Sequence, residues 1–322
     1  MKAKVLYLDK VTPEMEKVFL GNCPEEVDLC FNHPQGAGTP ECSIEEANYF
    51  FVTNFEVTKE VIDQGQALKM IQRTGVGYDN VDIEYAQSKN IPVSISAGSN
   101  AVSVAELAVA QILTLYRKIH LLNQMAKEGI WDSWKYRHES FEIYNKTIGV
   151  VGAGAIGRAV AKRLAAFEPE RIIYYDPIRQ SPEVEKELGL KFCDLDELMA
   201  VSDIVTLHLP LFDSTRGLIS KERIALMKEN AILINTARGP VVDQKALVEA
   251  VRSGAMAGAG LDVFDPEPFV RGQEVLSLDN IITTPHIGAA TVDNFTRAIR
   301  YCLDNVLRFE RGEKIMNVVN GL

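Results

Sequence analysis

The stretch TIGVVGAGAIGRAVAKRL, residues 147–164, decides the fold, because it changes from one kind of secondary structure to another within a few residues. Its first five residues form an apolar, β-branched run that predicts a buried strand, and the part from Ala155 onward predicts a helix. Three glycines, Gly152, Gly154 and Gly157, lie at the junction. A G-x-G-x-x-G pattern alone is weak evidence, but between a strand and a helix it indicates a βαβ unit.

Each glycine has a physical role in such a junction. Gly152 permits the tight turn, Gly154 lets the backbone approach a pyrophosphate, and Gly157 permits close packing of helix against strand. The helix start offers unpaired N–H groups and a positive dipole end to phosphates. Asp176 ends the next apolar run, RIIYYDP (171–177), nineteen residues after Gly157. A carboxylate there can accept a hydrogen bond from the ribose 2′-OH of NAD and would repel the 2′-phosphate of NADP.

Two alternatives accompany this interpretation. The glycines can serve packing alone, with Asp176 an unrelated turn residue before Pro177. In addition, Arg179 lies close enough in sequence to accommodate a 2′-phosphate, which leaves the choice between NAD and NADP open. We predict an NAD site because the strand, the glycines, the helix and the acid occur together at the expected spacing.

Short β-branched runs alternate with helical patterns along the whole chain, which predicts parallel sheets built from βαβ units. About five such runs occupy the first hundred residues, and about six lie between residues 146 and 286. Many are apolar at consecutive positions, as expected for strands covered on both faces. Long helical patterns cover residues 100–126 and 291–311. The chain after the second sheet is too short for a third domain, so we expect it to return to the first.

The overall composition is that of a globular protein: 322 residues, 47% hydrophobic and 24% charged, enough for about two domains. The net charge of −10 argues against a nucleic-acid partner. No run reaches the ~18 apolar residues of a membrane span, and no signal-peptide pattern opens the chain, so we expect no membrane partner and a cytoplasmic location.

The five cysteines form no C-x-x-C pair, and we expect free thiols in a reducing compartment. An alternative is a metal cluster of Cys23, Cys30 and Cys42. These three have no fourth ligand at a suitable spacing, so we expect no metal.

Polar side chains follow three predicted strands of the second sheet. Arg238 comes after AILIN, Asp262 and Glu267 come after GAGL, and His286 comes after IITT. In an open α/β sheet, ligands bind outside the carboxyl ends of the strands. We therefore expect a cation, a carboxylate and an imidazole at the edge that holds the dinucleotide.

These residue types suit hydride transfer between a nicotinamide and a hydroxy acid. A histidine titrates near working pH and can take up the hydroxyl proton as the hydride leaves. A carboxylate behind the imidazole orients it and favours its protonated form. A guanidinium can hold a substrate carboxylate and polarise its carbonyl. Any one of them alone is more often structural, but their joint placement favours a catalytic site. His208, which ends another strand, is expected to pack or to touch the cofactor.

Seven motifs together resemble the D-isomer-specific 2-hydroxy-acid dehydrogenases over nearly the whole chain. They are TGVGYDNVD (74–82), GSNAVSVAE (98–106), GVVGAGAIG (149–157), HLPL (208–211), INTARGPVVD (234–243), LDVFDPEP (261–268) and TPHIGAAT (284–291).

The resemblance implies roles for matched positions. Arg238, Glu267 and His286 take the catalytic places. The backbone N–H groups of Val76 and Gly77 are expected to bind the substrate carboxylate together with Arg238, and Asn100 lies in the matching substrate loop. The cofactor contacts implied are Gly152, Gly154, Ala155, Ile156, Gly157, Asp176, Leu209, Pro210, Thr236, Ala237, Asp262 and Gly288.

The resemblance also implies a homodimer through the cofactor domain, with the segment WDSWKYRHES (131–140) as its arm. The predicted fold class is α/β with two doubly wound domains. A Rossmann-type NAD-binding domain, residues 101–288, is inserted in a discontinuous flavodoxin-like substrate domain, residues 1–100 and 289–322.

Departures from the family bear on the substrate. The phosphoglycerate-specific branch usually carries an arginine after its third strand, but VTNFEVT (52–58) has none. That branch also commonly has a regulatory domain, which we do not expect here. We therefore expect reversible reduction of a small unphosphorylated 2-oxo acid by NADH to a D-2-hydroxy acid. Asn54, Phe55 and Tyr78 are candidates for shaping the substrate pocket. Two alternatives stay open: a 3-phosphoglycerate dehydrogenase and a dinucleotide-sensing, corepressor-like binding protein.

Overall fold

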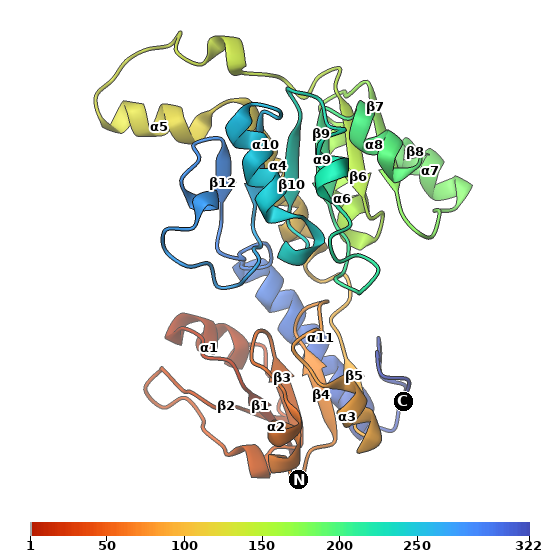
Figure 1. Cartoon of the computed structure of the whole chain (residues 1–322). Coiled ribbons are helices and arrows are strands. Elements are labelled where there is room, and N and C mark those ends of the chain that lie inside the picture. Colours follow the sequence, from red (N-terminus) through yellow and green to blue (C-terminus); the bar gives the residue numbers. More distant parts are fainter. Residues whose placement is uncertain (1) are drawn as a thin grey trace. The chain divides into compact units, whose positions relative to one another are not determined.

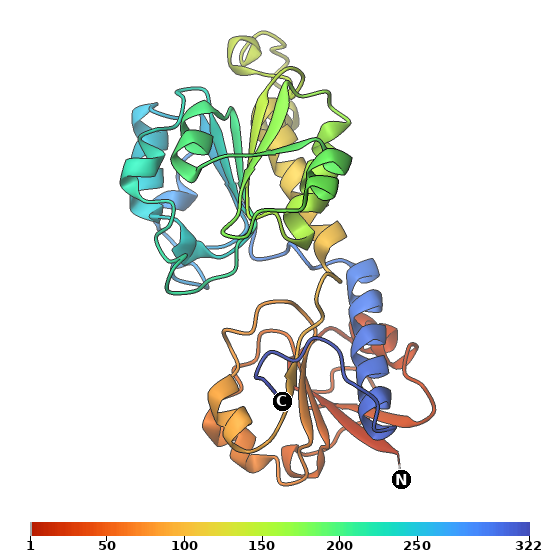
Figure 2. The same cartoon turned by 90° about the vertical axis from the view of Figure 1, so that its right-hand side faces the viewer.

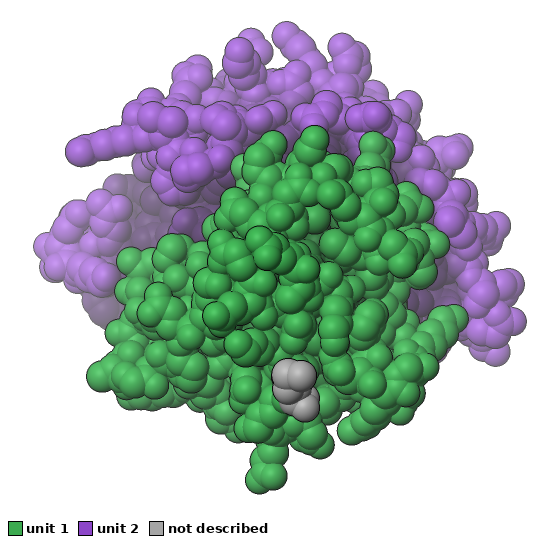
Figure 3. Space-filling view, turned by 90° about the horizontal axis from the view of Figure 1, so that it is seen from below, with its two compact units in different colours: residues 1–100, 289–322 green, residues 101–288 purple. Residues whose placement is uncertain are grey.

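The computed structural model describes residues 2–322 and contains two compact units. Unit 1 comprises residues 1–100 and 289–322, and unit 2 comprises residues 101–288 (Figure 3). Each unit is built on one parallel sheet with helices on both faces (Figures 1 and 2). The predicted fold class, α/β with two doubly wound domains, is confirmed.

The sheet of unit 1 has the strand order β2-β1-β3-β4-β5. The five predicted runs form these strands: β1 (Ala3–Tyr7), β2 (Val27–Phe31), β3 (Tyr49–Val52), β4 (Met70–Arg73) and β5 (Val93–Ser94). One face is covered by α1 (Pro13–Leu20) and α11 (Val292–Glu310), and the other by α2 (Lys59–Gln64) and α3 (Ile83–Ser88). This order is the flavodoxin-like one.

The sheet of unit 2 has the strand order β12-β11-β10-β9-β6-β7-β8. Its strands are β6 (Thr147–Val151), β7 (Arg171–Tyr175), β8 (Leu190–Phe192), β9 (Ile204–Leu207), β10 (Ile232–Asn235), β11 (Gly258–Leu261) and β12 (Ile281–Thr283). The first six in sequence have the Rossmann order, with the direction reversing between β6 and β9. The expectation of about six strands missed β8, an edge strand in which only Leu190 is buried.

Helices cover both faces of this sheet as well. One face carries α4 (Ala101–Tyr116) and α6 (Ala155–Ala165), and the other carries α8 (Leu195–Val201), α9 (Lys221–Ile224) and α10 (Gln244–Ser253). The remaining elements are α5 (Ile119–Lys127), α7 (Pro182–Leu188), η1 (Ile44–Glu46), η2 (Arg137–Glu139), η3 (Gly239–Val241) and η4 (Glu274–Leu276). Within residues 2–322, every helix is too short or too polar to span a lipid bilayer.

The helical pattern over residues 100–126 is broken, contrary to expectation. Lys118 has a left-handed backbone, with φ of 51°, and separates α4 from α5. Its side chain is buried and its ammonium lies 3.9 Å from a carboxylate oxygen of Glu139. Burial lowers the pKa of Lys118, and Glu139 acts against that shift. The periodicity of the sequence indicates neither the left-handed residue nor its tertiary contacts.

A buried amide ties α11 to the sheet of unit 1. The Nδ2 of Asn305 donates to Gln72 Oε1 on β4 and to Ser94 Oγ on β5, both at 2.8 Å. Its Oδ1 accepts from the backbone N–H of Met316 at 2.8 Å. Asn320 adds a second link, because its amide accepts from Val93 N–H and donates to the carbonyl of Ile91, each at 2.9 Å. Side-chain amides thus add to the backbone pairing of Ser94 with Val318 beside β5.

The cysteines are not all free, which corrects the expectation from the sequence. Cys30 on β2 forms a disulfide with Cys42 in the following loop, and Cys23, Cys193 and Cys302 are free. The number and spacing of the cysteines gave no indication of this pair. Cysteine usage therefore no longer supports a reducing compartment for the protein.

The Asn305 network leads to a prediction about stability. Asn305→Ala leaves buried polar groups of Gln72, Ser94 and Met316 without a partner, so unit 1 should lose about 3 kcal/mol of unfolding free energy. Urea denaturation monitored by hydrogen exchange of the β4 and β5 amides measures the loss. Asp304→Ala, which removes only an exposed ion pair with Arg308, is the control and should cost less than about 1 kcal/mol. Equal losses in the two variants would contradict the assigned role of Asn305.

Candidate active site

The glycine turn between β6 and α6 has the shape expected for a phosphate cradle. Gly152 has a φ of 94°, and a Cβ there would lie 2.7 Å from the carbonyl oxygen of His208. A Cβ on Gly157 would collide with the carbonyl oxygen of Gly152. Beside Gly154, in contrast, no atom of the described residues lies within 4 Å of a Cβ position. The turn is therefore closed at two glycines and open at the one where a pyrophosphate needs to approach.

Asp176 is fixed beside this turn. Its Oδ2 accepts a hydrogen bond of 2.8 Å from Ala153 N–H, and its Oδ1 accepts one of 2.9 Å from Ile178 N–H. Each carboxylate oxygen can accept a second hydrogen bond. The carboxylate is thus held at the end of β7 with capacity left for ribose hydroxyls.

Arg179 is the residue that could accommodate the 2′-phosphate of NADP, and its guanidinium is bound to a carboxylate other than Asp176. Its guanidinium donates two hydrogen bonds to Glu185, of 2.8 and 3.0 Å. The hydroxyl of Tyr174 donates to the same carboxylate at 2.6 Å. The hydrogen bonds from Arg179 and Tyr174 lower the pKa of Glu185 to about 2. Glu185 therefore competes with any 2′-phosphate for this arginine.

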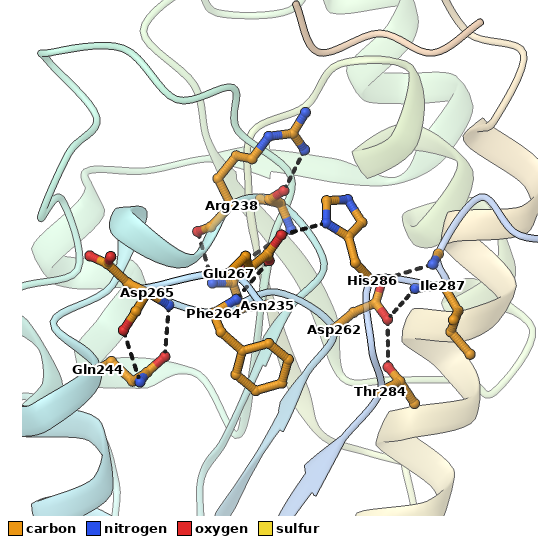
Figure 4. A network of polar contacts seen from close by, with 12 residues as sticks. Asn235, Arg238, Gln244, Asp262, Phe264, Asp265, Glu267, Thr284, His286 and Ile287 are labelled. Atoms are coloured by element: carbon orange, nitrogen blue, oxygen red, sulfur yellow. Dashed lines mark hydrogen bonds and ion pairs between the residues drawn. The ribbon is translucent and has the colours of Figure 1, made fainter. Parts of the chain in front are cut away.

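Three residues that follow different strands of unit 2 come together at its carboxyl edge (Figure 4). The Nδ1 of His286 lies 2.8 Å from Oε2 of Glu267. The other oxygen of Glu267 accepts a hydrogen bond of 2.8 Å from Phe264 N–H. Burial raises the pKa of Glu267, but these hydrogen bonds and the charges of His286 and Arg238 outweigh it, so the net shift is downward. Glu267 is therefore an ionised partner for the imidazole.

The backbone of His286 is unusual. Its φ of 53° lies in the left-handed region, which costs a non-glycine residue about 1–2 kcal/mol. Its N–H donates to the carbonyl oxygen of Asp262 at 2.8 Å. The carboxylate of Asp262 accepts from the N–H groups of Ile287 and Gly288 at 2.8 and 2.7 Å. Asp262 therefore holds the turn that carries the histidine.

This role of Asp262 did not emerge from the sequence, which suggested only a cofactor contact. The residue is 1% exposed. Burial raises the pKa of its carboxyl, although hydrogen bonds from Thr284, Ile287 and Gly288 act against that rise. The motif TPHIG shows a turn after a strand, but it does not show which acid binds that turn.

Arg238 is held by its backbone at the end of β10. Its carbonyl oxygen accepts from Asn235 Nδ2 at 3.1 Å, and Asn235 Oδ1 accepts from Ala237 N–H at 3.0 Å. Its Nη1 donates to the carbonyl of Ala237 at 2.7 Å. A Cβ at Gly239 would collide with backbone atoms of Phe264. The loop with Arg238 and the loop with Glu267 thus touch through backbone.

The other predicted cofactor positions lie along the same edge. Ala155 and Ile156 form the first turn of α6, whereas Leu209, Pro210, Thr236 and Ala237 follow β9 and β10. His208 lies among them, with Nε2 at 2.9 Å from Thr206 Oγ1. Burial lowers the pKa of His208 to about 3, so its ring is neutral at physiological pH. Both facts fit a packing role for this histidine.

The predicted substrate residues of unit 1 lie in loops after β4 and β5. Arg73 Nε donates to the carbonyl oxygen of Gly77 at 2.5 Å, which holds the loop that contains Val76. Ser96 N–H donates to the carbonyl of Gly75 at 3.0 Å. The Oδ1 of Asn100 is buried and has no hydrogen-bond partner within residues 2–322.

Asp9 is a further acid at this edge of unit 1, and the sequence analysis did not single it out. Its carboxylate accepts from the N–H groups of Thr53, Asn54 and Phe55 at 2.6, 2.6 and 2.9 Å. Asp9 lies two residues after the end of β1, so its position near a strand end was a signal that could have been used. The loop that lacks the arginine of the phosphoglycerate branch is thus built on a negative charge.

Comparisons with known proteins show which family this chain resembles. The model of the D-isomer specific 2-hydroxyacid dehydrogenase NAD binding domain matches residues 109–288. A D-3-phosphoglycerate dehydrogenase of Methanocaldococcus jannaschii is 42% identical over 266 residues, which are 82% of this chain but only 50% of that protein. This chain therefore spans about half the length of that relative.

Two further proteins are similar to this chain over a larger share of their own length. A hydroxypyruvate reductase of Thermotoga maritima is 44% identical over 241 residues, 74% of this chain and 76% of that one. The crystal structure of a D-lactate dehydrogenase from Aquifex aeolicus, complexed with NAD and lactic acid, has a TM-score of 0.81 and 30% identity over 99% of both chains. The chain belongs to the D-isomer specific 2-hydroxyacid dehydrogenase family of NAD-dependent oxidoreductases.

Proposed function

We propose that this protein reduces a small, unphosphorylated 2-oxo acid with NADH to the D-2-hydroxy acid, and catalyses the reverse reaction. The observation that carries the proposal is the 2.8 Å contact between His286 and Glu267 beside Arg238, in the unit matched by the NAD-binding model. The names of two relatives, a hydroxypyruvate reductase and a D-lactate dehydrogenase, support the substrate class.

The residues divide the chemical work. Bound NADH supplies a hydride to the carbonyl carbon of the 2-oxo acid. Since Nδ1 of His286 is engaged by Glu267, Nε2 is the nitrogen that gives a proton to the carbonyl oxygen, and takes it back in oxidation. Glu267 orients the ring and stabilises its protonated form. Arg238 binds the substrate carboxylate.

An unphosphorylated substrate is favoured by the loop after β3. Residues 52–58 contain no arginine or lysine, and the N–H groups of Thr53, Asn54 and Phe55 are already bound to the carboxylate of Asp9. A phosphate near this carboxylate would be repelled. The 3-phosphoglycerate dehydrogenase alternative is supported by two relatives of that name, and this chain spans half the length of each.

Other assignments are also proposals. Val76, Gly77 and Asn100 are candidate substrate contacts, unit 1 is the candidate substrate domain, and the location is proposed to be cytoplasmic. A homodimer through the cofactor domain is supported by exposed apolar side chains on the predicted arm, with Trp131 95% and Trp134 70% exposed.

The proposed function is tested by following NADH absorbance with glyoxylate, hydroxypyruvate, pyruvate and 3-phosphohydroxypyruvate. We expect rapid turnover of one of the unphosphorylated acids. His286→Ala should lower kcat by about 10²–10⁴-fold and leave the Kd for NADH within about threefold, because it removes the proton donor alone. His33→Ala, an exposed histidine of unit 1, is the control. NADH binding without turnover would favour the sensor alternative, and fast turnover by His286→Ala would reject the mechanism.

The pH profile tests the role of Glu267. Reduction needs a protonated imidazole. The kcat for reduction therefore falls as the pH rises through the apparent pKa of the enzyme–substrate complex. Hydrogen bonds and the charges of His286 and Arg238 lower the pKa of Glu267, so its carboxylate is ionised beside the imidazole. Glu267→Gln removes that charge and should move the falling limb to lower pH by about one unit. An unmoved limb in a profile of kcat would show that Glu267 does not act on the histidine.

Cofactor choice tests the roles of Asp176 and Glu185. Asp176→Ala should raise the KM for NADH about tenfold and improve the use of NADPH, because it removes the ribose acceptor and the repulsive charge. Adding Glu185→Gln releases Arg179 and should improve NADPH use by a further ~10-fold. The ratio of kcat/KM for the two cofactors measures both effects. Glu187→Gln replaces Glu185→Gln as a control, and an equal gain from it would exclude the competition for Arg179.

A further inference from the structure

A chain of hydrogen bonds leads from α4 to the turn of His286. Gln111 on α4 is 2% exposed, and its Nε2 donates to Thr284 Oγ1 at 3.2 Å. The Thr284 hydroxyl in turn donates to Asp262 Oδ1 at 2.5 Å. Figure 4 shows the last step, with Thr284 and Ile287 both directed to the carboxylate of Asp262.

The packing around Gln111 is arranged for this contact. A Cβ at Gly260 on β11 would lie 2.9 Å from Gln111 Oε1 and 3.1 Å from Gln111 Cβ. The strand therefore carries glycine where the side chain of Gln111 crosses it. The Oε1 of this buried glutamine has no hydrogen-bond partner within residues 2–322, so the bond from Nε2 to Thr284 is the contact that offsets the cost of burying the amide.

Asp262 connects the hydrogen bonds of Thr284 and Gln111 to the backbone around His286. Its carboxylate binds the N–H groups of Ile287 and Gly288, and its carbonyl oxygen binds the N–H of His286. These bonds hold His286 in a left-handed conformation that the residue would not otherwise prefer. The orientation of the Asp262 carboxylate therefore sets the position of the ring relative to Glu267.

We propose that Thr284 and Gln111 are positioning residues of the reaction, which act on His286 through Asp262. The inference rests on the proposed catalytic role of His286. The hydroxyl of Thr284 is suited to this position because it accepts from an amide and donates to a carboxylate at the same time. Serine keeps both functions, whereas valine keeps the shape of threonine and loses both.

Three variants separate positioning from general stability. Thr284→Val should lower kcat by about 10–100-fold, since an error of about 1 Å in a catalytic group can cost that much. Thr284→Ser should restore kcat to within about threefold of the parent enzyme. Thr283→Val, one residue earlier on β12, has its side chain on the opposite face of the strand and should also stay within about threefold. Each is assayed with NADH and the 2-oxo acid that the substrate panel identifies.

Two further measurements accompany the kinetics. The Kd for NADH, from protein fluorescence, should stay within about threefold in Thr284→Val, because the proposed effect falls on the histidine and not on cofactor binding. The ring C–H resonances of His286 in the NMR spectrum of the ligand-free protein should shift or broaden in Thr284→Val and not in Thr283→Val. The NMR comparison is independent of turnover. Should Thr284→Val fail to fold, Gln111→Leu replaces it, with an expected fall in kcat of about 3–10-fold.

The outcomes distinguish this inference from the proposed function. If His286→Ala is inactive but Thr284→Val matches Thr283→Val in kcat and in the histidine resonances, the positioning role alone is wrong. If Thr284→Val weakens NADH binding and leaves kcat unchanged, Asp262 acts on the cofactor and the inference is overturned. If His286→Ala retains full turnover, the catalytic role of His286 is rejected, and this inference falls with it.

Discussion

A loop that leaves the carboxyl end of a parallel strand carries backbone N–H groups that no neighbouring strand satisfies. In this protein, carboxylates satisfy them. Asp9 binds three N–H groups after β3, Asp176 binds one in the glycine turn and one after β7, and Asp262 binds two after β12. The same negative charges that make the edge rigid also set its chemistry, because each one repels phosphate or attracts a proton donor.

The hydrogen bonds to these carboxylates explain how loops at the edge of the sheet can hold a defined geometry. Loops are ordinarily the most mobile part of an α/β unit. Here the loops with Arg238, Glu267 and His286 are joined to one another by backbone contacts and by the hydrogen bond between the histidine and the glutamate. A proton donor that keeps its place before substrate arrives needs less reorganisation during the reaction.

Much of the fold could be predicted from the sequence, because its information is local. Glycine spacing, an acid after the next strand and apolar runs of strand length are enough to recognise βαβ units. The features of the fold that were not predicted from the sequence depend on contacts between residues distant in the chain. The edge strand β8 is short and has one buried residue, Lys118 interrupts a continuous helical pattern with a left-handed backbone, and Cys30 meets Cys42 only once the loop has folded. At the site, the strand-end positions of Arg238, Asp262 and His286 were visible in the sequence, but the loop N–H groups that Asp9 and Asp262 bind were not.

The discontinuity of unit 1 has a consequence for the order in which the chain can fold. Unit 2 is contiguous, so all of its strands are available once residue 288 has been synthesised. Unit 1 waits for α11, whose Cys302, Leu303 and Val306 fill one side of its core. During synthesis the part of this sheet face that α11 covers therefore stays exposed while the whole of unit 2 is made, and exposed apolar surface favours aggregation and chaperone binding.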